Sequence, residues 1–169
     1  MLGSTGTGST PHLAMEELLG AQQISYTHIP FKGTTDQMLA LASGTIMAGM
    51  NSTGFAPWID NGKLRLLAVF SDQRSARWPQ VPTMKELGFA QAVYNSPWGL
   101  VAPAGTPASV MVALHDAFKA ALFTPRHLTE LQRYDQDASY LDGAAYKQML
   151  VQSSLRERKL LQRMKLLAE

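Results

Sequence analysis

Strand and helix signals alternate from the N-terminus to about residue 102. Runs typical of strands fall at 24–29, 45–50, 64–70 and 92–102, and between them lie patterns typical of helices at 11–22, 35–42 and 56–61. The run at 64–70 (LRLLAVF) is almost continuously apolar, as expected of a strand that is buried on both faces. This alternation predicts an α/β fold with a mostly parallel sheet.

The chain changes character after PAGTP at 103–107. Helical patterns follow one another at 108–123, 125–134 and 143–168, with only a short candidate strand at 138–141 before the last of them. The first and the last of these helices each carry an apolar stripe that needs a surface to cover. A helical segment is therefore expected to follow the α/β part.

Composition excludes several classes of protein. The chain has no cysteine, which excludes disulfides, thiolate catalysis and cysteine-ligated zinc, and a formal net charge of +2 is too small to indicate a nucleic-acid partner. His115 and His127 lie at no repeating metal-ligand spacing, and neither Gly-x-Ser-x-Gly nor His-Glu-x-x-His occurs. We expect no metal site, no cofactor and no enzymatic activity. No apolar run is long enough to span a bilayer, and no signal-peptide pattern opens the chain.

The segment GSTGTGSTPHL at 3–13 places a glycine-rich loop before a helix. Thr10 suits the N-cap position, and proline suits the first helical position. Free N–H groups of such a loop converge at the positive end of the helix dipole, which favours an anion such as a carboxylate. A nucleotide is not indicated, since no Gly-Lys-Ser/Thr occurs and Pro11 stands where a dinucleotide fingerprint needs glycine. The residues alone leave open a flexible leader that only caps the helix.

Four stretches resemble one family, in sequence and in order. They are GSTGTGSTPHLAMEELL (3–19), THIPFKGTTDQMLALASGTI (27–46), APWIDNGKLRLLAVFSDQRSARWPQVPTMKELGF (56–89) and SPWGLVAPAGTPASVMVALHDAFKAAL (96–122). Together they resemble the extracytoplasmic solute-binding receptors of tripartite tricarboxylate transporters, the Bug or TctC proteins. The turn HIPFKG and the strand GKLRLLAV with WPQVPT downstream are the most distinctive pieces.

The resemblance implies a periplasmic protein of two α/β lobes, of the periplasmic-binding-protein type II kind, with the ligand held between the lobes. The glycine-rich loop opens the second lobe in this family, so residues 1–97 are expected to be that lobe. Residues 98–169 are expected to be the segment that returns to the first lobe, most of which an N-terminally truncated chain would lack. The implied activity is binding of a small carboxylate for delivery to the membrane subunits of the transporter.

The resemblance also implies which residues hold the ligand. In these receptors loop backbone and hydroxyl groups bind a carboxylate, often through water. The residues that match by position are Ser4, Thr5, Gly6, Thr7, Gly8, Ser9 and Thr10. We add His12 at the start of the helix, and Asn51 and Ser52, which end a parallel strand where α/β sheets usually place ligands. Dicarboxylates, tricarboxylates, acidic amino acids and aromatic acids all stay open.

A second hypothesis is a truncated remnant or interaction module that binds no small molecule. In either case the apolar stripes of 108–123 and 143–168 need cover, so we expect this form of the chain to be a homo-oligomer. His28 and Lys32 are expected to be structural. Trp98 either walls the ligand cleft or packs in a core.

Overall fold

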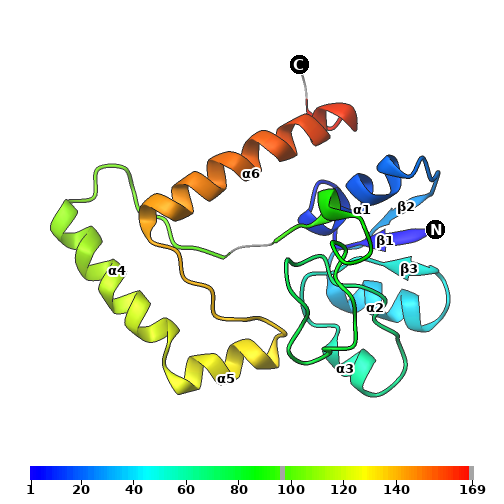
Figure 1. Ribbon diagram of the computed structural model, residues 1–169, viewed down its shortest axis with the longest axis horizontal. Coiled ribbons are helices and arrows are strands. Elements are labelled where there is room, and N and C mark those ends of the chain that lie inside the picture. The colour runs from blue at the N-terminus through cyan, green and yellow to red at the C-terminus, as the bar shows by residue number, and fades with distance from the viewer. Residues whose placement is uncertain (96–97, 168–169) are drawn as a thin grey trace. The chain divides into compact units, whose positions relative to one another are not determined.

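Three short parallel strands organise the N-terminal part of the chain (Figure 1). The computed structural model describes residues 1–95 and 98–167. Strand β1 (Leu2–Ser4) lies in the middle, β2 (His28–Pro30) pairs with one edge and β3 (Ala48–Gly49) pairs with the other. The predicted α/β fold with a parallel sheet is confirmed, although the strands are shorter than the predicted runs at 24–29 and 45–50.

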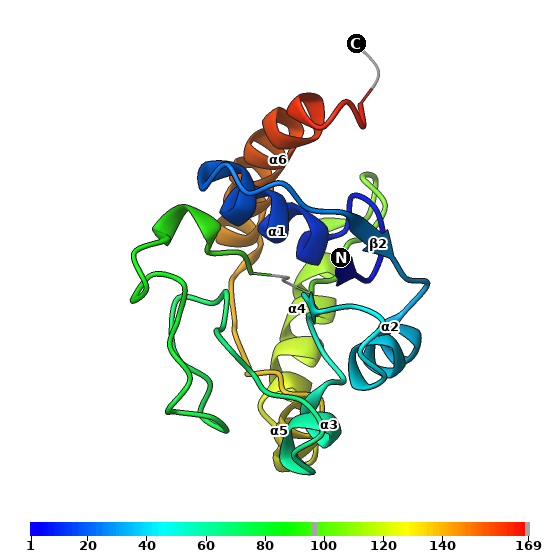
Figure 2. The same ribbon diagram turned by 90° about the vertical axis from the view of Figure 1, so that its right-hand side faces the viewer.

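Helices connect the strands and make up much of the remaining chain. Helix α1 (Thr10–Ala21) joins β1 to β2, and α2 (Thr34–Ala42) joins β2 to β3. In Figure 2, α1 and α2 lie on opposite sides of the strand that starts at the N-terminus. The later elements are α3 (Ala56–Asp60), the 3-10 helix η1 (Ala90–Ala92), α4 (Ala108–Leu122), α5 (Pro125–Arg133) and α6 (Gly143–Arg163).

By their internal contacts the residues form two units. One unit comprises Met1–Ser96 with Ser153–Glu169, and the other comprises Pro97–Gln152. The sheet, α1 and α2 all belong to the first unit. The candidate site therefore depends on the first unit.

Local capping explains where α1 begins. Ser9 has extended backbone and its Oγ accepts from the N–H of His12 at 3.4 Å, so Ser9 is the N-cap. The predicted cap Thr10 is instead the first helical residue, and Pro11 follows it, where its missing N–H costs nothing.

The predicted strand at 64–70 is wrong. Its contribution to strand pairing among the described residues is a bridge between Val69 and Thr83, made by Val69 N–H to Pro82 O and Met84 N–H to Val69 O, both at 2.9 Å. Proline has no N–H and cannot donate to a ladder, so the pairing does not extend past Pro82. Apolar sequence without a continuous partner stays irregular.

The predicted strands at 92–102 and 138–141 are also wrong. The first includes Ser96 and Pro97, which lie outside the described residues; the rest of it is irregular apart from Ala92, the last residue of η1. Its Tyr94 N–H donates to Phe70 O at 2.8 Å, and no strand among the described residues lies beside it to continue the pairing. Trp98 is 81% exposed, so it is not a core residue.

The C-terminal half of α6 packs against α1. Leu160 is 3% exposed and belongs to one hydrophobic cluster with Leu13 and Tyr94. The Arg156 guanidinium lies 3.9 Å from the centroid of the Tyr94 ring, close enough for a cation–π interaction. The expectation that the stripe of 143–168 has no cover is therefore wrong for Leu160.

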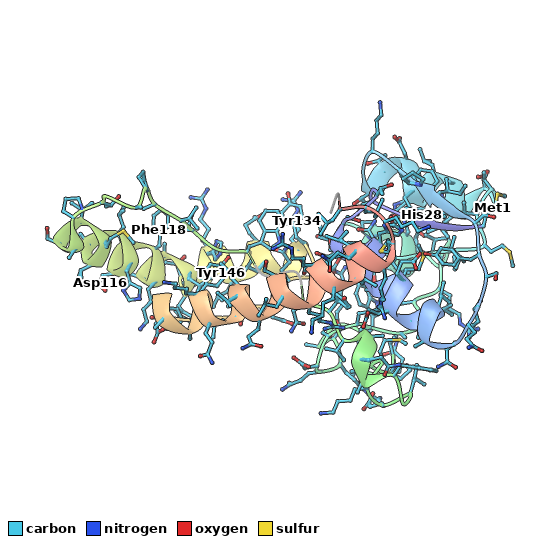
Figure 3. The ribbon with its side chains drawn as sticks, turned by 90° about the horizontal axis from the view of Figure 1, so that it is seen from above. Met1, His28, Asp116, Phe118, Tyr134 and Tyr146 are labelled. Carbon is cyan, nitrogen blue, oxygen red and sulfur yellow. The ribbon has the colours of Figure 1, made fainter. Side chains whose placement is uncertain are left out.

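Helix α4, in the second unit, has no buried residue. Its exposed large apolar side chains are Val110, Met111, Val112, Leu114 and Phe118, and Figure 3 shows Phe118 on this helix. Across residues 1–95 and 98–167, none of the helices combines the length and the apolar character that crossing a membrane requires.

Candidate functional site

Two loops meet where β1 and β3 end. The order β2-β1-β3 means that the chain crosses from β1 to β2 and then returns past β1 to β3. The carboxyl ends of β1 and β3 thus form the switch point of the sheet, where open α/β sheets bind ligands. Residues 4–10, from the last residue of β1 onward, and residues 50–52 after β3 occupy this point, which we call the switch-point site.

Gln37 of α2 ties these two strand ends together. Its side chain is fully buried, and its Nε2 donates to Gly3 O and to Met50 O, both at 2.9 Å. Its Oε1 accepts from Asn51 Nδ2 at 2.9 Å. A Cβ at Gly49 would lie 2.5 Å from Gln37 Nε2, so glycine makes room for this amide. Gln37 was not among the predicted site residues, because its only signal is a glutamine on the apolar side of a helix.

Asn51 belongs to the same framework. Its Oδ1 accepts from Thr53 N–H at 3.2 Å and lies 3.3 Å from the Thr34 hydroxyl, while its Nδ2 donates to Gln37. Ser52 follows it and is exposed. The structure thus brings both predicted residues to the switch-point site, with Asn51 engaged in hydrogen bonds of the protein. Their contact with a ligand stays a prediction.

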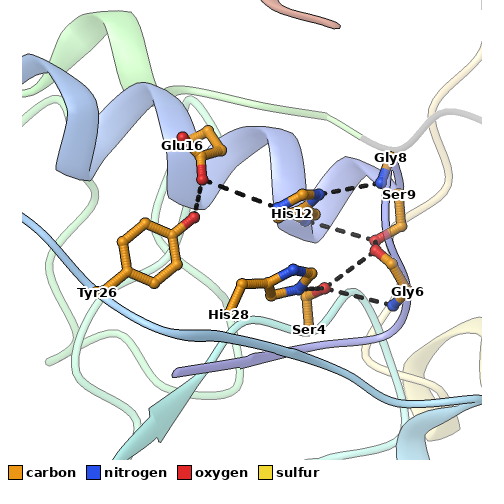
Figure 4. A network of polar contacts seen from close by, with 8 residues as sticks. All are labelled: Ser4, Gly6, Gly8, Ser9, His12, Glu16, Tyr26 and His28. Atoms are coloured by element: carbon orange, nitrogen blue, oxygen red, sulfur yellow. Dashed lines mark hydrogen bonds and ion pairs between the residues drawn. The ribbon is translucent and has the colours of Figure 1, made fainter. Parts of the chain in front are cut away.

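The glycine-rich loop is braced by its own serines (Figure 4). Ser4 Oγ donates to Gly6 O at 3.0 Å and accepts from Gly6 N–H at 3.3 Å, and Ser9 Oγ donates to Gly6 O at 2.7 Å. Gly6 at φ +135° and Gly8 at φ +76° adopt backbone that favours glycine. Ser4 is 0% exposed, so its hydroxyl contacts the loop from the protein interior. Ser4 and Ser9, both predicted ligand residues, therefore brace the loop, and their contact with a ligand stays a prediction.

Three threonines of the loop keep their donors free. Over residues 1–95 and 98–167, no hydrogen bond uses the N–H group or the hydroxyl of Thr5, Thr7 or Thr10. Thr10 also stands at the positive end of the α1 dipole. The loop thus offers three N–H groups and three hydroxyls without adding a charged side chain, an arrangement suited to an anion.

Two histidines stack beside the loop (Figure 4). The rings of His12 on α1 and His28 on β2 have centroids 3.8 Å apart and planes at 10°. Gly8 N–H donates to His12 Nδ1 at 3.0 Å, and His28 Nε2 lies 2.8 Å from Ser4 Oγ. His12 is buried and holds the loop; its contact with a ligand stays a prediction. His28 was expected to be structural, but its bond to Ser4 was not predicted.

Burial keeps both rings neutral near neutral pH. Burial lowers the pKa of His12, the adjacent His28 lowers it further, and Glu16 raises it. Burial also lowers the pKa of His28. Glu16 Oε1 lies 3.8 Å from His12 Nε2 and accepts from the Tyr26 hydroxyl. Burial and that hydrogen bond raise the pKa of Tyr26. The histidines consequently add no positive charge to the site.

Ser4 and His28 are not arranged as a nucleophile and its base. The Ser4 proton is directed to Gly6 O, and the hydroxyl has no access to solvent, so an external substrate cannot reach it. Within the described part of the chain, no group of three or more His, Cys, Asp or Glu side chains could hold a metal ion.

The fold is that of periplasmic-binding-protein-like solute receptors. A crystal structure of a TctC solute-binding protein from Polaromonas matches with a TM-score of 0.77 at 28% identity, covering 96% of this chain and 56% of that one. A protein of R. palustris, solved with adipate, matches with a TM-score of 0.76 at 22% identity, covering 96% of this chain and 55% of that one. The second match supports the fold alone.

The chain belongs to the tripartite tricarboxylate transporter family receptors, TctC, which it matches over residues 1–166. It is 40% identical over 162 residues to the "UPF0065 protein in gbd 5'region" of Cupriavidus necator, covering 96% of this chain and 49% of the relative. The chain thus spans about half the length of this curated relative. The predicted family is confirmed, and the family is a class of periplasmic solute-binding receptors.

Proposed function

We propose that the switch-point site holds one carboxylate of a small solute in a periplasmic receptor. The observation that carries the proposal is the set of free N–H and hydroxyl donors of Thr5, Thr7 and Thr10, in the loop that leads into the positive end of α1. Neutral donors bind a carboxylate without an ion pair. Such a site suits a receptor that must later release its solute to membrane subunits.

In this proposal residues 1–97 form the second lobe and 98–169 form a segment that returns to the first lobe. The ligand lies in a cleft between the lobes, and its contacts with both stabilise the closed receptor. Membership of the TctC family supports a carboxylate ligand. The R. palustris neighbour solved with adipate makes a linear dicarboxylate the first probe to use.

Adipate is expected to shift the amide NMR signals of residues 4–10 in the isotope-labelled full chain. Affinity should be weak, because this chain spans about half the length of its curated relative, and complete sites bury about 70–90% of a ligand. Gly6→Ala is expected to weaken binding by about tenfold or more, since Gly6 sits at φ +135° and an alanine there costs about 1–3 kcal/mol. Chemical-shift titration measures both effects.

Gly20→Ala is the matched control for this experiment. Gly20 lies at the exposed end of α1 with nothing within 4 Å of its missing Cβ, so binding should not change. Shifts confined to Pro97–Gln152, or equal weakening by both variants, would contradict the proposal. No shift with adipate or other carboxylates would favour the alternative, a remnant that binds no small molecule.

The exposed apolar side chains of α4 favour a second proposal, self-association of this form of the chain. Fully burying a large apolar side chain contributes about 1.5–3 kcal/mol, and these side chains are 40–60% exposed, so covering each one contributes about half of that. Size-exclusion chromatography with light scattering should give a mass above the 18.5 kDa of one chain. Val112→Lys with Phe118→Lys should lower that mass, whereas Leu67→Lys, also exposed but in the first unit, should not. A monodisperse monomer of the unsubstituted chain would refute self-association.

A further inference from the structure

The hydrogen bond between Gly8 and His12 has a fixed direction. Gly8 N–H can only donate, so His12 Nδ1, 3.0 Å away, must present a lone pair. The ring proton of His12 then sits on Nε2, the nitrogen that lies 3.8 Å from Glu16 Oε1. A second proton would enter at Nδ1, remove the acceptor and place two N–H groups head to head. Protonation of His12 is thus incompatible with the observed loop contact.

His28 behaves differently, although its ring stacks on that of His12. Ser4 Oγ gives its single proton to Gly6 O at 3.0 Å, so His28 Nε2 is the donor in the 2.8 Å contact with Ser4 Oγ. A second proton on His28 would enter at Nδ1 and leave this contact intact. Of the two histidines, only His12 loses its bond to the loop when it is protonated.

The groups around His12 disfavour its protonated form on balance. The stacked His28 on β2 repels a second charge, and burial in the first unit opposes any charge. Glu16, one turn along α1, favours the charged form, and Glu16 also accepts from Tyr26, which precedes β2. From α6 the loop meets apolar Leu161, whose Cδ2 lies 3.9 Å from a Cβ built at Gly8.

We propose that His12 is a positioning residue for the carboxylate-binding loop: the neutral ring anchors Gly8, and the protonated ring releases it. Release frees the segment that carries the donors of Thr7 and Thr10, so solute binding weakens in acid. This inference deepens the proposed function: the weakening of solute binding in acid rests on that function.

The direction of the pH effect follows from burial. Burial lowers the pKa of His12, so the loop stays anchored at neutral pH and is released as the pH falls through that lowered value. The unfolded chain takes up the proton at a higher pH than the folded chain, so the free energy of unfolding also falls across this acid range. About one pH unit below the transition, roughly a tenth of the loops stay anchored and adipate affinity falls about tenfold.

NMR titration of the isotope-labelled full chain tests the anchor directly. The Gly8 amide signal and the ring nitrogens of His12 are expected to change with the same midpoint. His12→Asn keeps an oxygen acceptor near the place of Nδ1 and cannot be protonated, so the Gly8 signal should lose its pH dependence. His12→Ala should leave the Gly8 signal in its released position at every pH. His127→Asn, in the second unit, is the control and should leave the Gly8 titration unchanged.

Adipate titrations at each pH separate this inference from the proposed function. Acid weakening in the unsubstituted chain that disappears in His12→Asn supports both. If Gly8 and His12 titrate together and adipate shifts no signal at any pH, the anchor stands and the proposed function fails. A Gly8 signal that does not follow His12, or that still titrates in His12→Asn, overturns the inference. If His12→Asn does not fold, the shared midpoint in the unsubstituted chain decides alone.

Discussion

Leu160→Asp is expected to unfold the unit that carries the switch-point site. Leu160 is almost fully buried and packs with Leu13 of α1 and with Tyr94. Shortening a buried leucine to alanine already costs about 2–5 kcal/mol, and an unpaired buried carboxylate costs more. Since a domain of this kind has about 5–15 kcal/mol of stability in total, the loss should remove most of it. Urea unfolding followed by circular dichroism, with hydrogen exchange of α1 amides, measures the effect.

The same helix offers a matched control. Leu155 is 57% exposed, so Leu155→Asp should change the free energy of unfolding by about 0.5 kcal/mol or less. An unfolding midpoint that Leu160→Asp leaves in place would show that α6 does not pack on α1 in solution. Equal loss in both variants would point to the helical propensity of α6 instead of the buried contact.

Polar contacts hold this end of α6 in place as well. Arg156 donates to Val93 O at 2.8 Å and also to Gln91 O, and it lies 3.6 Å from a Glu17 carboxylate oxygen on α1. These partners come from segments far apart in the sequence. The helix that follows the glycine-rich loop is thus held by residues at the other end of the chain, and the site depends on them.

Helices were predictable because their signals are local. Ser9 and Thr124 are N-caps with a proline one or two residues on, and each accepts from an N–H three residues on. Helices α1 and α5 therefore begin within a residue of their predicted starts. Strands were not predictable in the same way, because an apolar run becomes a strand only where a partner offers N–H and C=O groups. The run at 64–70 meets a segment interrupted by Pro82 and makes one bridge.

In the candidate site, too, features with local signals were predictable and contacts between distant segments were not. Glycine spacing and the following helix predicted a loop with free N–H donors, whose binding of an anion stays a prediction. The resemblance predicted the family that the comparison confirmed. The braces were not predictable, because Gln37 reaches Gly3 and His28 reaches Ser4 only through the pairing of strands distant in sequence. Nothing in the sequence near Ser4 distinguishes a buried brace from an exposed donor.

Gln37→Leu is expected to lower the free energy of unfolding by about 2–6 kcal/mol. Leucine nearly matches the size of glutamine, so the loss comes from hydrogen bonds and not from a cavity. Met50 O and Asn51 Nδ2 would each lose a partner, at about 1–3 kcal/mol apiece, while Gly3 O would keep the N–H of Met50. Urea unfolding measures the loss. Gln22→Leu, at the exposed C-cap of α1, is the control and should change little.

Gln37→Glu tests the same amide through the direction in which stability changes with pH. A loss of packing alone would not change with pH. An ionised carboxylate would face the oxygens of Gly3 and Met50, so burial and repulsion should raise its pKa above the usual range for glutamate. A raised folded-state pKa gives stability that is present below the unfolded pKa and is lost as the pH rises through the folded value. Compared with the unsubstituted chain at the same pH, the variant should therefore lose least stability in acid and approach the instability of Gln37→Leu at neutral pH. Equal stability of Gln37→Glu and the unsubstituted chain at neutral pH would mean that the amide does not join β1 to β3.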